Sequence, residues 1–281
     1  MKRFLLIYFV ISLFVSAQQG ESLADKRLMK IVHDQQRLMA QAETGKDADD
    51  YVNTSSEPQI RQLAARWSRY INDHPKDVEA RLLYGKFLRT FGESESAILE
   101  FLAADALEPE LPVIKQQIGN YYAEHGLYEE ALKAFIQAVE LAPEESIYHY
   151  QLGEVLYRYR WQIIEDDIYT RATLDEQMSR AFGQAAQLAP EDLGLQMRYA
   201  ESFYDLESPD WAKAALQLEH CASLAESHVH KQTVHLHQAR VAAEMGELEI
   251  AKTHLDSVTM KALAKSEARV RAMIQARVEG N

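Results

Sequence analysis

Four histidines form the densest group of metal-binding side chains in the sequence. His228, His230, His235 and His237 fall within ten residues, and imidazole is a common zinc or copper ligand. On one helix, the pairs that face the same way are seven residues apart, which is about 10.5 Å along the axis and too far for one ion. A metal site would require His228 and His230 to fold back from a loop, so the four remain weak metal candidates and we expect no cofactor.

Other routes to catalysis are not indicated by the sequence. It contains no GxxxxGK phosphate loop and no GxGxxG, HExxH or GxSxG pattern. Its paired carboxylates, Glu129-Glu130, Glu144-Glu145 and Asp166-Asp167, lie at expected helix starts, at turns or in an inserted segment. Acidic side chains at such places stabilise helix N-termini. We therefore expect a protein that is not an enzyme.

The elements that position these side chains follow a 34-residue period. Two series of residues keep this interval, namely Pro75, Pro109 and Pro143, and Gly85, Gly119 and Gly153. A fixed period of this length is typical of stacked helical hairpins. A protein built from such hairpins offers an extended surface for binding.

One period, residues 112–145, predicts two amphipathic helices. Apolar side chains recur at helical spacing and a glycine marks the turn; the residues are Ile118, Tyr122, Gly126, Ala131, Phe135 and Ala138. Small residues at Gly119 and Ala138 allow the two helices to approach closely, and Phe135 fills the space between them. Pro143 cannot continue the second helix. A single hairpin cannot bury its apolar face alone.

At these residues the chain resembles the tetratricopeptide repeat (TPR) family. The preceding repeat matches through Gly85, Ala97, Phe101, Ala104 and Pro109, and the following one through Leu152, Gly153, Phe182, Ala185 and Pro190. Upstream, Trp67, Tyr70 and Pro75 indicate a half repeat. The resemblance covers roughly residues 58–258. It implies an all-α, right-handed TPR superhelix of about five helical hairpins with extra N- and C-terminal helices.

This reading divides the chain into four parts. The expected parts are a signal peptide at 1–17, an N-terminal helix and polar linker at 18–57, the solenoid at 58–258, and a C-terminal capping helix at 259–281. The repeats are expected near 78–111, 112–145, 146–192, 193–226 and 232–258. The third carries thirteen extra residues between Gly153 and Phe182, because Pro190 lies 47 residues after Pro143. Its first helix is expected to run longer than usual, and a capping box at 173–176 to start the second. The insertion is either a packing variation or a binding loop.

The N-terminus predicts export. Lys2 and Arg3 precede a short apolar run that ends in small residues, as in a cleaved secretory signal. An uncleaved anchor is the alternative. We expect a periplasmic or secreted protein with no stable membrane insertion after cleavage. A net charge of −13 disfavours nucleic acid and anionic membranes as partners. The single cysteine, Cys221, cannot form an internal disulfide and is expected to be a small buried residue.

The TPR resemblance implies that a ligand binds along the concave face, which the first helix of each hairpin lines. The positions carried over are Lys86, Arg89, Gln116, Asn120, Glu124, Tyr150, Glu154, Tyr157, Arg158, Glu201 and Tyr204. The lysine and asparagine clamp of the TPR proteins that hold chaperone C-termini is not matched, because Asn120 is present but Leu82 and Gln116 stand at the lysine position.

The sequence thus predicts a non-catalytic scaffold or adaptor that binds a protein or peptide. Two alternatives remain open at this stage. One is a structural module that associates with itself through its terminal helices or exposed repeat edges. The other is a metal-binding or enzymatic domain that uses the histidines, the insertion or both.

Overall fold

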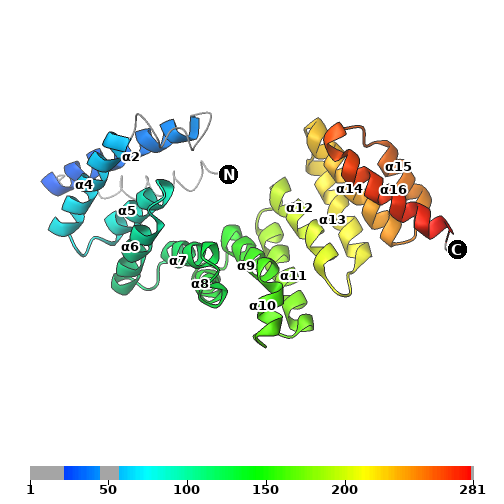
Figure 1. The fold of residues 1–281 in the computed structure, drawn as a ribbon, viewed down its shortest axis with the longest axis horizontal. Helices are drawn as coiled ribbons and strands as arrows, with labels where there is room; N and C mark the ends of the chain where they lie inside the picture. The colour runs from blue at the N-terminus through cyan, green and yellow to red at the C-terminus, as the bar shows by residue number, and fades with distance from the viewer. Residues whose placement is uncertain (1–21, 45–56, 280–281) are drawn as a thin grey trace. The chain divides into compact units, whose positions relative to one another are not determined.

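The computed structural model describes residues 22–44 and 57–279, which form two compact units divided between Tyr121 and Tyr122. The described residues contain helices and turns and no strand, so the all-α prediction is confirmed (Figure 1). The predicted signal peptide and most of the predicted linker lie outside the described residues. Within those residues, no helix combines the length and the apolar character needed to cross a bilayer.

The described residues of unit 1 contain four helices and most of a fifth. They are α2 (Leu23–Thr44), α4 (Glu57–Asp73), α5 (Val78–Thr90), α6 (Ser94–Leu107) and the greater part of α7 (Pro112–Glu124). Helices α5 and α6 pack against each other as a pair. Asp77 caps α5, since its Oδ1 accepts a hydrogen bond from the Ala80 amide at 2.9 Å, which satisfies one of the free N–H groups of the first turn.

Helix α2 packs on α4 and α5. The indole Nε1 of Trp67 on α4 donates to Gln35 Oε1 on α2 at 2.8 Å, and Gln35 Nε2 donates to the Leu83 carbonyl on α5 at 3.3 Å. Both Gln35 and Trp67 are buried. Through these two hydrogen bonds the Gln35 side-chain amide connects α2 to α4 and α5. The sequence predicted the half repeat around Trp67 and a separate upstream helix, but not that α2 would stand beside α4 as the first helix of a pair.

Unit 2 starts with the last turn of α7 and continues through the rest of the described chain. Its elements are α8 (Tyr128–Leu141), α9 (Ser146–Arg158), α10 (Arg160–Glu165), α11 (Arg171–Leu188), α12 (Leu193–Ser202), η2 (Phe203–Asp205), α13 (Trp211–Leu224), α14 (His228–Glu244), α15 (Leu248–Asp256), η3 (Lys261–Leu263) and α16 (Ala264–Glu279). Helices α9 and α11, α12 and α13, and α14 and α15 are packed pairs, and α16 covers α14 and α15. Cys221 is buried in α13.

The insertion of the third repeat forms α10 and the loop that follows it. The expected long first helix is interrupted at Tyr159, whose φ of −105° and ψ of 19° separate α9 from α10. The phenolic hydroxyl of Tyr159 donates to the Ala123 carbonyl at 2.5 Å. The expected cap at Thr173 is wrong by three residues: the side chain of Thr170 accepts from the Thr173 amide at 3.2 Å, and α11 begins at Arg171.

A phenylalanine of the second helix lies against a glycine of the first in both units. A Cβ placed on Gly85 would lie 2.4 Å from the Phe101 ring, and one on Gly153 would lie 2.7 Å from the Phe182 ring. Both rings are fully buried. The glycines therefore set how closely the two helices of a pair approach, as the sequence predicted.

We expect Gly153→Ala to destabilise unit 2 by about 1 kcal/mol. Overpacking a core costs about 1–3 kcal/mol, while alanine regains about 1 kcal/mol of helix propensity over glycine. Gly183→Ala on α11 is the matched control, because a Cβ there would lie 3.4 Å from the Tyr199 ring, which is ordinary contact. Urea unfolding of both variants checks this. Equal stability of the two variants would contradict the close approach at Gly153.

Candidate functional site

The residues predicted for the concave face are divided between the units. Unit 1 holds Lys86 and Arg89 on α5 and Gln116 and Asn120 on α7; unit 2 holds Glu124 on α7, Tyr150, Glu154, Tyr157 and Arg158 on α9, Glu201 on α12 and Tyr204 on η2. In unit 1, burial lowers the pKa of the Lys86 ammonium, as does the nearby Arg89. Arg89 Nη1 donates to Gln117 Oε1 at 3.0 Å.

Two of the unit 2 residues, Glu154 and Tyr157, contact Arg198 of α12. Arg198 Nε donates to Glu154 Oε1 on α9 at 2.6 Å. The guanidinium carbon of Arg198 also lies 4.7 Å from the centre of the Tyr157 ring and 4.0 Å from that of Phe182. A cation over an aromatic face is attracted by the ring quadrupole. Arg198 therefore links α9, α11 and α12, and fixes the Tyr157 ring between the repeats.

The stack of arginines and aromatic rings continues into the insertion. The guanidinium of Arg160 on α10 lies 4.6 Å from the Tyr157 ring centre and 5.2 Å from that of Trp161, and Arg171 lies 5.7 Å from Trp161. Trp161 is 59% exposed although it is a large apolar side chain. We call Trp161, Arg160, Tyr157, Arg198 and Phe182 the arginine–aromatic ladder.

A second polar group joins η2 and α12 to α14. The Tyr204 hydroxyl lies 3.1 Å from His237 Nδ1, and His237 Nε2 lies 3.4 Å from Glu201 Oε1. The tautomer that satisfies both contacts carries its proton on Nε2, so Tyr204 donates to Nδ1 and Nε2 donates to Glu201. The guanidinium of Arg240 stands 3.6 Å from the centre of the Tyr204 ring. All four side chains are thus held by one another.

Burial governs the titration of this group. It lowers the pKa of His237 to about 4, with a further lowering by Arg240. Burial raises the pKa of the Glu201 carboxyl despite the opposing charge of Arg198, and it raises the pKa of the Tyr204 hydroxyl well above its usual value. A tyrosine with a raised pKa is a poor nucleophile and a poor base at neutral pH. The chain of hydrogen bonds resembles a triad in connectivity but lacks the activation that nucleophilic catalysis needs.

The four histidines are not brought together as a metal site. Helix α14 begins at His228 with Ser227 as its cap, so His228 and His230 are helical and do not fold back. His235 Nδ1 faces His254 Nδ1 on α15 at 3.3 Å, while His237 faces Tyr204. Among the described residues, no group of three or more His, Cys, Asp or Glu side chains is arranged to hold a metal ion.

Three contributors to this surface were not identified from the sequence: Arg198, Arg240 and Trp161. Arg240 occupies the same repeat position as the predicted site residues Glu154 and Glu201, because each directly follows a small residue of the first helix. Applying that position to the fifth repeat identifies Arg240. Arg198 and Trp161 carry no comparable signal, because the register does not show which arginine will lie over which ring.

The helical pairs, their 34-residue spacing and the glycine contacts agree with one known family. Residues 117–158 match the family model of the tetratricopeptide repeat. This stretch therefore has the sequence pattern of a tetratricopeptide repeat, and the fold of the chain is that of TPR proteins. No curated protein matches its sequence.

Solved TPR structures resemble the chain in fold at low sequence identity. YrrB, a TPR protein with an unusual peptide-binding site, is 16% identical with a TM-score of 0.60, and the match covers 74% of this chain and 99% of YrrB. PilF of Pseudomonas aeruginosa is 15% identical with a TM-score of 0.59, covering 89% and 99%. PilW, a type IV pilus biogenesis factor, is 13% identical with a TM-score of 0.52, covering 80% and 91%.

We expect the stability of the protein to fall between pH 6.5 and pH 4 through His237. In this window the unfolded chain binds a proton on His237 that the folded chain does not, so folding becomes less favourable as the pH falls. A shift from 6.5 to about 4 corresponds to at most about 3 kcal/mol. The raised pKa of Glu201 acts with the opposite sign, since it costs stability as the pH rises.

Comparison of wild type with His237→Gln separates the two effects, because Glu201 is present in both proteins. Urea unfolding at pH 7 and pH 4.5 is the measurement. The stability difference between the proteins should change in favour of the variant at the lower pH. A constant difference would show that His237 titrates normally in the folded protein.

Proposed function

We propose that this TPR protein is a non-catalytic scaffold that binds a peptide or a protein segment on the first-helix surface of unit 2. The single observation that carries the proposal is the arginine–aromatic ladder. Tryptophan, tyrosine and arginine are the side chains that contribute most to binding energy in protein interfaces. Here they come from three helices and an insertion, and they reach the surface at Trp161.

The ladder is suited to binding because its inner members are already fixed. Arg198 is held by Glu154 and lies between two rings, while Arg160 Nη1 donates to the Tyr157 carbonyl at 2.9 Å. Side chains that are ordered before binding lose little conformational entropy when a partner arrives. The insertion of the third repeat therefore has a role in the proposal: it adds an exposed aromatic anchor next to the predicted site residue Tyr157.

The titration behaviour of the second polar group supports recognition over catalysis. Glu201, His237 and Tyr204 are shifted in the directions that burial dictates, and each shift favours the neutral form. The mutually bonded groups hold α12, η2 and α14 in one arrangement. Such a group maintains the shape of a binding surface without supplying a nucleophile.

Export is the second part of the proposal. It is supported by the charged, apolar and small-residue order of the first seventeen residues. We propose that the mature protein is periplasmic or secreted and serves as an adaptor within an exported assembly. A protein or peptide is the proposed partner, and the acidic character of the chain disfavours nucleic acid.

We expect Trp161→Ala to weaken partner binding by about 30-fold, in keeping with the roughly 2 kcal/mol typical of an interface hot spot. Stability should change by less than about 0.5 kcal/mol, because the side chain is mostly exposed. Leu216→Ala is the matched control: Leu216 is 67% exposed on α13, a second helix. Crosslinking capture from the native extracellular or periplasmic fraction, with quantification of each captured protein, is the measurement.

Two results would contradict the proposal. A partner captured equally by both variants would place binding elsewhere. Recovery of this chain alone, with a mass that rises with concentration, would favour the self-associating module.

A further inference from the structure

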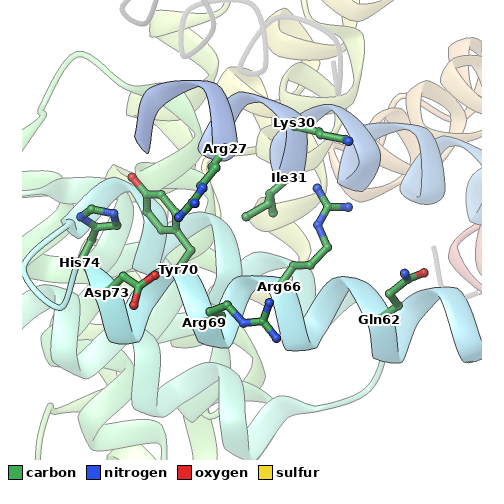
Figure 2. A pocket seen from close by; sticks show the side chains of 9 residues that line it. All are labelled: Arg27, Lys30, Ile31, Gln62, Arg66, Arg69, Tyr70, Asp73 and His74. Atoms are coloured by element: carbon green, nitrogen blue, oxygen red, sulfur yellow. The ribbon is translucent and has the colours of Figure 1, made fainter. Parts of the chain in front are cut away.

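A basic pocket lies between α2 and α4 in unit 1 (Figure 2). It measures about 490 Å³ and is lined by Arg27, Lys30 and Ile31 of α2, by Gln62, Arg66, Arg69, Tyr70 and Asp73 of α4, and by His74. Four permanently cationic side chains and one carboxylate therefore border a pocket in a chain whose net charge is −13. The pocket belongs to neither the ladder nor the predicted concave-face set.

The cations come in two pairs on facing helices. Arg27 and Lys30 are three residues apart on α2, and Arg66 and Arg69 are three residues apart on α4, so the members of each pair are neighbours on one side of their helix. Figure 2 shows Arg27 reaching from α2 toward Tyr70 and Arg66 rising from α4 toward α2. An anion that enters between the helices would be contacted from both sides.

Among the residues of unit 1 that the structure describes, most of this positive charge has no ion-pair partner. Arg66 Nη1 donates to Asp34 Oδ2 at 2.7 Å, and Arg37 approaches the same carboxylate at 3.8 Å. Among the described residues, no carboxylate pairs with Arg27, Lys30 or Arg69. These three side chains are exposed. Asp73 borders the pocket and Asp25 lies near His74, so the excess positive charge is centred on the two helix faces.

The floor of the pocket adds apolar and aromatic surface. Ile31 and Tyr70 are buried, and the Tyr70 hydroxyl is already used, since it donates to Asp77 Oδ2 at 3.0 Å. The Tyr70 ring lies 4.6 Å from the His74 ring, centre to centre. The pocket therefore combines guanidinium and ammonium donors at its rim with a fixed ring beneath them.

From this arrangement we infer that the α2–α4 pocket binds an acidic peptide segment, with at least two carboxylates held by Arg27, Lys30 and Arg69. Arginine forks match carboxylates in paired geometry, and the aliphatic stem of a glutamate can lie on Ile31 and Tyr70. A bilayer surface is flat and cannot enter a recess between two helices.

The probe is a fluorescein-labelled peptide of eight glutamates, titrated with the full chain by fluorescence anisotropy; the same peptide with glutamines is the uncharged control. The test variant is Arg27→Gln with Arg69→Gln. The matched control is Arg37→Gln with Arg61→Gln, because these exposed arginines lie on the same two helices, remove the same charge and do not line the pocket.

We expect the test variant to bind the glutamate peptide at least tenfold more weakly than wild type at low salt. The control variant should lose less than threefold, and the glutamine peptide should not bind. Binding should weaken with added salt, as screening requires. Trp161→Ala should leave it unchanged, which separates this inference from the proposed function. Circular dichroism and thermal unfolding confirm that both double variants fold.

Three outcomes would overturn the inference. The first is absence of peptide binding by wild type, and the second is equal loss in both double variants, which would indicate unspecific attraction. The third is selective loss of binding to vesicles that contain phosphatidylserine, with peptide binding unchanged in the test variant, which would assign the pocket to a lipid headgroup. Full displacement of the peptide by millimolar inorganic phosphate would reduce the site to a small-anion site and count against a peptide as well.

Discussion

The contact between a glycine and a phenylalanine ring controls the geometry on which the rest of each unit depends. At Gly85 and Gly153 the first helix presents bare backbone, and the buried ring of Phe101 or Phe182 from the second helix lies against it. The Phe182 ring makes two contacts: it lies against Gly153, and the Arg198 guanidinium lies over it. The close packing of α9 and α11 and the position of Arg198 over Tyr157 therefore depend on the same side chain.

This contact connects the core to the surface. Glu154 and Tyr157 follow Gly153 by one and four residues on α9, and Arg198 of α12 contacts both of them beside the Phe182 ring. Arg160 lies over the rings of both Tyr157 and Trp161, so the series of ordered side chains continues to the exposed Trp161. Binding proteins profit from such order because the entropy of fixing the side chains is lost during folding and not at the encounter with a partner. The basic pocket of unit 1 differs in this respect, since three of its four cations, Arg27, Lys30 and Arg69, are exposed.

The sequence predicted the repeating core well and the surface in part. The period, the glycines and the phenylalanines are local signals, and each repeat supplies them again, so the helix pairs could be read directly. Gln35 and Leu83 are 48 residues apart, and nothing local indicates that one amide would join α2, α4 and α5. Arg198 and Glu154 are 44 residues apart, and nothing local in the sequence indicates their contact either. The acidic residue at position 176 predicts a cap at Thr173, whereas Thr170 ends the loop and caps α11.

The most direct test of the central claim is photo-crosslinking from two positions in otherwise unchanged protein. A benzophenone amino acid is placed at Arg158, which is exposed on α9 beside Tyr157, or at Leu216 on the second-helix surface of α13. The account predicts a partner crosslink from position 158 and none from position 216 in the native extracellular or periplasmic fraction. A crosslink from position 216 alone, or only to a second copy of this chain, would contradict it.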